Sequence, residues 1–218
     1  MPARRLAHVR LAGEHAHIRA HMPADGAPAF ALLERREEIL RWLVWDGPSS
    51  VSELCEHYAH WCFESGADCD YRLAIEERAS GALAGSISIR FGGHPGQGDV
   101  GYWVGLPFQG RGLGGEALEL AAYLAFEHLA AQSLYAWVFV ENLASRRILE
   151  RAGFTLVRTV PGRIVKRGAP VDEWHFVLRA NEWRRVRRDF RPQVVELEWE
   201  DGPRADPLES PARPFPSG

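Results

Sequence analysis

A glycine-rich segment from residue 110 to residue 115 is the part of the sequence whose residue types point most directly to chemistry. Four of its six residues are glycine, and a long stretch of helical spacing follows it. Glycine is costly at a helix start unless the backbone must adopt unusual angles or let a ligand approach closely. The first turn of a helix also carries unpaired N–H groups and the positive end of the helix dipole. The segment therefore predicts a phosphate or diphosphate site, with Arg111 as an added positive charge.

Two other classes of phosphate-binding loop can be compared with this segment. A nucleoside-triphosphatase loop needs Lys and Ser or Thr after the glycines, and residues 115–117 are Gly-Glu-Ala, which argues against that class. A dinucleotide fingerprint, G-x-G-x-x-G, is satisfied by Gly110, Gly112 and Gly115. However, the acid beyond the next strand, Glu141, comes later than that fingerprint requires, and the preceding strands are predicted as a meander rather than a βαβ unit. A dinucleotide-binding oxidoreductase stays open as an alternative.

The segment from Gln109 to Gly114, Q-G-R-G-L-G, matches the pattern Q/R-x-x-G-x-G/A. In this the sequence resembles the GNAT superfamily of acetyltransferases, in which that pattern binds the diphosphate of acetyl-CoA. Further agreements are Asp99–Val104 before the loop, Asn142-x-x-Ser145 followed by Gly153-Phe154, and Glu173–Leu178 with Asn181-Glu-Trp183. The last of these is similar to the ending of the RimJ/RimL-type branch. The resemblance covers about residues 6 to 183.

The resemblance implies a mixed α/β fold with a central twisted, mostly antiparallel sheet, flanked by helices and splayed between its fourth and fifth strands. It implies that pantetheine amides pair with the exposed backbone of the fourth strand, and that main-chain amides of the glycine-rich loop hold the diphosphate. The residues expected to bind the cofactor are Trp103, Val104, Gln109, Gly110, Arg111, Gly112, Leu113, Gly114, Gly115, Asn142 and Ser145. The implied reaction is direct attack of a primary amine, either a protein N-terminal amine or a small-molecule amine, on the acetyl group of acetyl-CoA.

The attacking amine must lose a proton, because amines are partly or mostly protonated at neutral pH. Asp99 is the first candidate for the proton acceptor, since histone-type members carry a glutamate on the corresponding strand. Glu141 is the second, although either acid could equally be a solvated surface charge. Ser145 is the candidate proton donor to the CoA sulfur, because Leu149 stands where other branches carry a tyrosine. The glutamate that RimL-like enzymes use has no counterpart in residues 160–163, so the base assignment stays open, as does a CoA-binding module without catalysis.

The spacing of apolar residues predicts the elements that position these groups. A first strand is expected within residues 8–19, two short helices within 24–45, and an amphipathic helix from residue 51 behind a capping box at Ser50-x-x-Glu53. A three-strand meander, a helix to about residue 130, a buried strand over 134–140, a helix from Asn142 to Gly153 and closing strands over 154–160 and 173–178 follow. Asn142 also suits the N-cap of its helix, a role compatible with ligand contact.

Composition limits the remaining classes. The chain has 218 residues, of which 46% are hydrophobic and 25% charged, as is ordinary for a folded globular protein, and its net charge of −3 argues against a nucleic-acid or membrane partner. Cys55, Cys62 and Cys69 are odd in number and form no CxxC pair, which favours a reducing, cytoplasmic setting. No signal peptide or membrane-length apolar run is visible. His15-x-His17 and His57-x-x-His60 lack the partners of a zinc site, so no metal is expected.

The chain is predicted to divide into three parts. Residues 1–183 form the GNAT acetyltransferase domain, residues 184–200 an extension with an add-on strand, and residues 201–218, with five prolines, a disordered tail. The alternating segment 194–200 could also pair two copies into a homodimer. The acceptor amine cannot be identified, because the segments 20–65 and 160–172 that would shape its site follow no known pattern.

Overall fold

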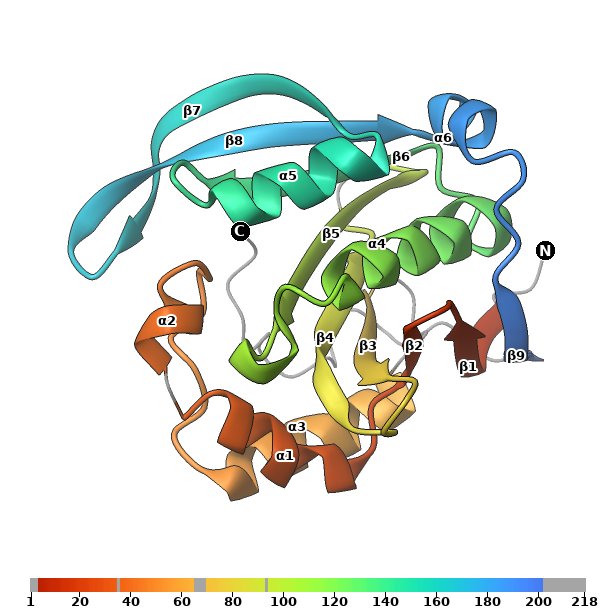
Figure 1. Cartoon of the computed structure of the whole chain (residues 1–218), viewed down its shortest axis with the longest axis horizontal. Helices are drawn as coiled ribbons and strands as arrows, with labels where there is room; N and C mark the ends of the chain where they lie inside the picture. The colour runs from red at the N-terminus through yellow and green to blue at the C-terminus, as the bar shows by residue number, and fades with distance from the viewer. Residues whose placement is uncertain (1–3, 35, 65–69, 93, 202–218) are drawn as a thin grey trace.

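A nine-stranded sheet forms the centre of the computed structural model, which describes residues 4–34, 36–64, 70–92 and 94–201, with the backbone alone at residues 4, 5, 36, 62–64 and 201. The strands are β1 Arg4–Ala12, β2 Ala16–Ala20, β3 Asp70–Glu77, β4 Leu83–Arg90, β5 Gln97–Val104, β6 Ser133–Phe139, β7 Thr155–Lys166, β8 Ala169–Arg179 and β9 Gln193–Asp201. The helices are α1 Gly26–Leu32, α2 Arg36–Leu40, α3 Val51–Glu64, α4 Leu113–Tyr123, α5 Leu143–Ala152 and α6 Ala180–Val186, with short turns η1 Pro23–Asp25, η2 Leu106–Phe108 and η3 Leu124–His128. The sheet order is β7-β8-β6-β5-β4-β3-β2-β1-β9 (Figure 1).

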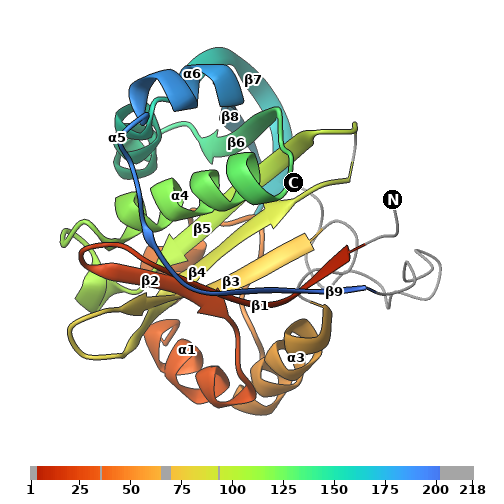
Figure 2. The ribbon, with the colours of Figure 1, turned by 90° about the vertical axis from the view of Figure 1, so that its right-hand side faces the viewer.

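Helices cover both faces of the sheet, with α4, α5 and α6 on one face and α1 and α3 on the other (Figure 2). Side chains alternate along a strand, so Ile87 and Ile89 of β4 enter the core under α4, whereas Ser86 points to the opposite face. The core on the α1/α3 face is smaller and includes Leu54 and Tyr58 of α3. The predicted one-faced helix after residue 50 is therefore confirmed.

The sheet opens between β5 and β6, its parallel pair. These strands are paired at only three positions, Gln97–Ser133, Gly98–Leu134 and Asp99–Tyr135, and diverge beyond them. The expected splay at this place is confirmed. The meander over β3 to β5 is also confirmed. A βαβ unit nevertheless follows it, so the prediction that a meander here argues against such a unit is wrong. The last strand of a meander can still pair in parallel with the next strand across a helix, and β5, α4 and β6 do so.

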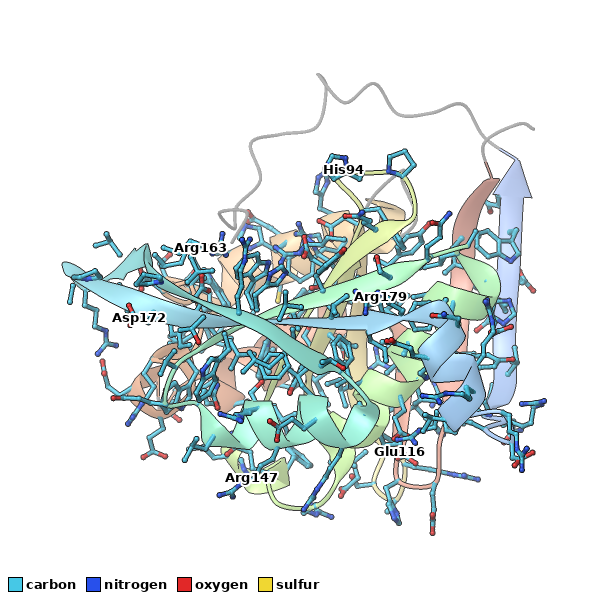
Figure 3. The ribbon with its side chains drawn as sticks, turned by 90° about the horizontal axis from the view of Figure 1, so that it is seen from above. His94, Glu116, Arg147, Arg163, Asp172 and Arg179 are labelled. Atoms are coloured by element: carbon cyan, nitrogen blue, oxygen red, sulfur yellow. The ribbon has the colours of Figure 1, made fainter. Side chains whose placement is uncertain are left out.

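The region predicted as one strand over residues 8–19 is a hairpin of two strands, β1 and β2. Its turn at residues 13–15 is held by Glu116 of α4, whose carboxylate accepts hydrogen bonds of 2.5–2.8 Å from the main-chain N–H groups of Glu14 to Ala16. Figure 3 labels Glu116. These partners lie about a hundred residues apart in the sequence, so local alternation could not reveal the turn.

The C-terminal part differs from the prediction in extent. β7 and β8 continue well beyond the predicted strands over 154–160 and 173–178 to form a long hairpin, and α6 was not predicted at all. The add-on strand is confirmed as β9, which pairs with β1 at one edge of the sheet. Residues 202–218, nearly all of the predicted tail, lie outside the described residues. No helix in the described part of the chain is long and apolar enough to cross a membrane.

Candidate active site

The glycine-rich loop carries the chain from β5 into α4. Gly110 and Gly112 have φ of 74° and 82°, in the left-handed region that favours glycine. Gly112 is the N-cap of α4, and because it has no side chain it cannot cap the N–H groups of the first turn. At Gly115 an added Cβ would meet no heavy atom within 4 Å. Gln109 ties the loop to the strand, because its Nε2 donates to the carbonyl of Val104 at 2.8 Å. The start of α4 is therefore open to an anionic ligand that would accept hydrogen bonds from its N–H groups.

A cavity of about 820 Å³ lies at the gap between β5 and β6 and reaches both faces of the sheet. From the α4 side it is lined by residues that include Gly110, Gly112, Gly114, Gly115, Asn142, Ser145, Arg147 and Arg151. From the α1/α3 side it is lined by residues that include Trp45, Tyr58, Trp61, Arg72, Ser86, Trp103, Trp137 and Glu173. The cavity can thus take a long ligand whose anionic end meets the helix amides and whose other end passes through the sheet.

The register of β5 against β4 decides which main-chain groups of β5 face the gap. The N–H of Gly105 donates to the carbonyl of Ala84 at 2.8 Å, and hydrogen-bonded pairs alternate along antiparallel strands. Trp103 therefore directs its main-chain groups toward β4, while Tyr102 and Val104 direct theirs toward the gap. The main-chain groups of Trp103, where a pantetheine contact was predicted, therefore do not face the gap, and its side chain lines the cavity.

Two hydroxyl groups meet where α5 approaches β5. Asn142 is the N-cap of α5, and its Oδ1 accepts a hydrogen bond from the N–H of Ser145 at 3.2 Å, as expected of a cap. The hydroxyls of Ser145 and Tyr102 lie 3.0 Å apart. Burial raises the pKa of Tyr102 to about 12, although its hydrogen bond with Ser145 opposes the shift. The tyrosine therefore stays protonated at neutral pH and forms, with Ser145, a pair of hydroxyls at the gap.

The family model described as the acetyltransferase (GNAT) domain matches residues 16–155, more than half of the chain. The chain belongs to the GNAT acetyltransferase family. The predicted family and its mixed α/β fold are thereby confirmed, and the chain is identified as an acetyltransferase.

Relatives of the RimJ/RimL type share this GNAT fold. YdaF of Bacillus subtilis (strain 168), a protein named for ribosomal N-acetylation, is 26% identical over 175 residues, which cover 78% of this chain and 94% of YdaF. The structure of Mycobacterium smegmatis RimJ in complex with CoA-disulfide has a TM-score of 0.72 and 20% identity, covering 89% of this chain and 98% of that one. The ribosomal-protein-S5-alanine acetyltransferase of Vibrio fischeri has a TM-score of 0.71 and 16% identity, covering 80% and 98%.

The positive charges around the GNAT loop differ from the sequence-based expectation. The guanidinium of Arg111 forms an ion pair with Glu77, and its side chain is not among the residues that line the cavity. Two exposed cations of α5, Arg147 and Arg151, do line it. Figure 3 shows Arg147 on α5 and Arg163 on β7, on opposite sides of the β8 ribbon. The loop can therefore offer its main-chain amides to an anion beside these two cations of α5, and the role of Arg111 in binding the cofactor stays a prediction.

The structure separates the acids that were considered as the base. Asp99 is half-buried at the end of the paired part of β5, where burial raises its pKa against the opposing effects of Arg90, Arg163 and a hydrogen bond with Trp137. It is not among the residues that line the cavity. Glu141 is exposed, has a φ of 84° and does not line the cavity either. The roles of Asp99 and Glu141 as proton acceptors stay predictions.

Sequence reasoning missed two groups of the site, Tyr102 and Glu173. Tyr102 lay within a quoted strand motif but was not recognised as the partner of Ser145. Glu173 is 1% exposed, lines the cavity and accepts a hydrogen bond from Arg163, whose guanidinium carbon lies 4.0 Å from the ring centre of Trp137. Its position in a predicted strand, directly before the run Trp174–Leu178, could have signalled a buried acid, and a buried carboxylate needs a partner.

The tip of the β7–β8 hairpin lies near α2 (Figure 1). Lys166, the only lysine in the chain, is buried and donates to the carbonyl of Trp45 at 3.0 Å, with Asp46 as an ion-pair partner. Arg167 forms two hydrogen bonds with Glu37 of 2.5 and 2.9 Å. Because Trp45 itself lines the cavity, these contacts fix part of the wall opposite the glycine-rich loop.

One group of residues in the described part of the chain has the arrangement of metal ligands, namely His8, Glu196 and Glu198 on β1 and β9. All three are exposed, and none of them lines the cavity.

Proposed function

We propose that this GNAT acetyltransferase uses acetyl-CoA as its donor and transfers the acetyl group to a primary amine, either the N-terminal amine of a protein or a small-molecule amine. The observation that carries this proposal is the cavity at the parted strands, with open helix amides at one end and an aromatic, charged wall at the other. A donor with a diphosphate and a long arm fits the first end and places its thioester at the gap. The amine then enters from the opposite face of the sheet.

At the donor end, the proposed diphosphate contacts are the main-chain amides of residues 109–115, as the family signature implies. Arg147 and Arg151 stand beside this loop and complement the charge of the donor's phosphates. Main-chain groups of Tyr102 and the N–H of Val104, whose carbonyl is engaged by Gln109, hold the pantetheine arm together with the amide of Asn142. The structure of RimJ with CoA-disulfide supports a CoA-type donor for this fold.

In the proposed reaction a neutral amine attacks the acetyl carbon, a C–N bond forms and the C–S bond breaks. The departing sulfur takes a proton from Ser145, whose hydroxyl is replenished through Tyr102. Asp99 would act as proton acceptor only through an intervening water, because its side chain does not line the cavity. The fixed hydroxyl pair thus serves the leaving group at the donor side of the gap.

The acceptor class is supported by the names of relatives. YdaF is named for ribosomal N-acetylation, and the Vibrio fischeri enzyme is named for the alanine of a ribosomal protein. These names favour a protein N-terminal amine over a free small amine. The homodimer through residues 194–200 stays a proposal, for which the position of β9 at the sheet edge is the support.

Calorimetry with acetyl-CoA and with NAD tests the donor, and mass spectrometry of a panel of peptides with free N-termini, polyamines, amino acids and aminoglycosides tests the acceptor. We expect acetyl-CoA to bind and NAD not to bind, with acetylation of at least one peptide N-terminus. Preferential binding of NAD would favour the dinucleotide alternative. Binding of acetyl-CoA without transfer to any amine would reduce the protein to a CoA-binding module.

A further inference from the structure

Asp25, His21 and Ser86 form a chain of polar contacts from the core to the cavity, and Ser86 is remote in the sequence from the other two. His21, at the end of β2, is fully buried, and its Nε2 lies 2.9 Å from the hydroxyl of Ser86 on β4. Its Nδ1 lies 3.6 Å from a carboxylate oxygen of Asp25. Ser86 lines the cavity on the α1/α3 face and pairs with Trp103 of β5, the strand that borders the gap. The contacts thus connect a buried carboxylate to the side from which an amine would enter.

The carboxylate of Asp25 decides the tautomer of His21. If His21 carried its proton on Nε2, the lone pair of Nδ1 would face the negative charge of Asp25. A proton on Nδ1 points toward that charge instead and leaves Nε2 as an acceptor for the Ser86 hydroxyl. Ser86 also has the carbonyl of Leu73 within 3.2 Å, but the contact with His21 is shorter. The favoured arrangement has Ser86 donating to His21.

Asp25 is held in its ionised form by neighbours that do not reach the cavity. Both of its oxygens accept hydrogen bonds from Arg19 at 2.8 Å, and the N–H of Met22 donates to it at 2.8 Å. Burial acts to raise the pKa of Asp25, but the hydrogen bonds from Arg19 and Met22, together with the nearby His21 ring, outweigh it and hold that pKa well below its usual range. Arg19 also pairs with Glu76 at 2.7 Å, so the carboxylate behind His21 is part of a fixed network.

The surroundings of His21 keep its imidazole neutral and in place. Its ring stacks on Tyr58 of α3 with centres 4.1 Å apart, and the ring of Trp61 lies 5.5 Å away. Burial lowers its pKa, and the charges of Arg19 and Arg72 act in the same direction, while Asp25 opposes them. A neutral imidazole whose Nε2 accepts a hydrogen bond from the Ser86 hydroxyl is the form that can take up a proton from it.

We propose that Ser86 and His21 relay the proton of the acceptor amine, with Asp25 as the positioning residue behind them. As the C–N bond forms, the amine nitrogen gives a proton to the Ser86 oxygen, directly or through one water, and the Ser86 hydroxyl proton moves to Nε2 of His21. The imidazolium is stabilised by Asp25. The C–S bond breaks and the sulfur takes its proton from Ser145 on the other side of the gap, and both groups then exchange protons with water. This inference rests on the proposed acetyl transfer.

The acids near the gap are less suited to this role. Asp99 does not line the cavity, and Glu173, which does, is engaged by Arg163. A carboxylate already paired with a guanidinium is a weaker proton acceptor than a neutral imidazole. Ser86 is therefore the lining group with a neutral base directly behind it.

Steady-state kinetics of Ser86 variants test the relay, with the best amine of the panel as acceptor and release of the CoA thiol as readout. Ser86→Ala should lower kcat by about 100-fold, a value typical of a lost general base, without changing the affinity for acetyl-CoA. Its remaining rate should continue to rise with pH, whereas the wild-type rate levels off once His21 is neutral. Ser86→Thr keeps a hydroxyl and should recover most of kcat. Ser88→Ala, two residues along on the same face of β4, is the matched control and should keep the wild-type pH profile.

A second pair of variants protects the test against misfolding. His21→Gln can still hydrogen-bond to Ser86 but cannot accept a proton, and His21→Phe preserves stacking on Tyr58. Both should bind acetyl-CoA like the wild type and show the pH profile of Ser86→Ala. Amines of low basicity, which need little help to lose a proton, should be acetylated nearly as fast by these variants as by the wild type.

The outcomes separate the two proposals. If the wild type does not bind acetyl-CoA, the proposed function itself fails. If it transfers acetyl but Ser86→Ala and His21→Gln keep its rate and pH profile, the relay alone is wrong. An acetyl group found on Ser86 by mass spectrometry would also contradict the relay, because Ser86 would then be a nucleophile. If no amine reacts, slow hydrolysis of acetyl-CoA gives the same comparison, with water as the acceptor. Equal hydrolysis by all variants, or no hydrolysis by the wild type, counts against the relay.

Discussion

Replacing Gly115 by alanine is expected to stabilise the protein and to weaken its binding of acetyl-CoA at the same time. Gly115 is the third residue of α4, and a Cβ there would meet no heavy atom within 4 Å. Its φ lies outside the left-handed region, so alanine fits the free protein without strain and reduces the freedom of the unfolded chain. In the complex, the same methyl group would stand where a phosphate approaches the first-turn amides.

The two effects can be given magnitudes. Alanine is favoured over glycine in a helix by up to about 1 kcal/mol, and 1 kcal/mol shifts the Tm of a chain of this size by roughly 2–4 °C. We therefore expect the Tm of the free Gly115→Ala protein to rise by about 1–4 °C. A hydrogen bond to a charged group contributes about 1.5–3 kcal/mol, so losing one to a phosphate would raise the Kd for acetyl-CoA by roughly 10- to 150-fold.

Scanning calorimetry measures the first effect and titration calorimetry the second. Acetyl-pantetheine, which has the thioester arm but no diphosphate, is the control ligand, and its affinity should be the same for the wild type and Gly115→Ala. An unchanged Kd for acetyl-CoA would show that no phosphate reaches these amides. An equal loss for both ligands would also refute the reasoning, because the methyl group would then obstruct the pantetheine arm.

The remaining predictions concern the proton donor and the buried ion pairs. Tyr102→Phe removes the hydroxyl beside Ser145 and should lower kcat by about tenfold with little change in the Kd for acetyl-CoA. The matched variant Tyr123→Phe, on α4, should keep wild-type kinetics. A fall in affinity for acetyl-CoA without a fall in kcat would assign Tyr102 to binding. The lowered pKa of Asp25 means that its contribution to stability is present above the unfolded-state pKa of about 3.9 and is lost as the pH falls below it. Asp25→Asn should therefore lower the free energy of unfolding at pH 7 by about 3–5 kcal/mol, because it removes one of the two carboxylates, Asp25 and Glu76, that balance the buried charge of Arg19. It should also flatten the loss between pH 4 and pH 3, which urea unfolding at the three pH values would check.

Local signals in the sequence were sufficient for the donor side of the site. The glycines of the loop and the Asn142 cap act through their immediate neighbours, and the structure places both as expected. Likewise the helix after residue 50 follows from its own apolar spacing. The ionic partner of Arg111 could not be predicted, because Glu77 lies at the end of β3, far from the loop in the sequence, and nothing near Arg111 points to it.

The acceptor side depends on contacts between remote residues, and sequence reasoning found little of it. His21 and Ser86 are 65 residues apart, and neither is unusual in its own segment. Whether the main-chain groups of Trp103 face the gap depends on the register of β5 against β4. A shift of one residue would turn them from β4 to the gap. The tip of the β7–β8 hairpin is held by Lys166, whose partners near α2 are distant in the sequence. The apolar alternation within the two strands therefore predicted a shorter hairpin than the one that forms.

The alternation of β5 would let one gap serve both proposed substrates. Tyr102 and Val104 face the α4 side and its donor loop, whereas Gly101 and Trp103 face the α1/α3 side, where Ser86 lies. Gly101 lines the cavity on the α1/α3 side of the gap. Because it has no side chain, it leaves the passage from this face to the gap open. Parting of the strands would be insufficient if a large side chain stood there, since the amine would then be kept from the thioester although both ligands could still bind.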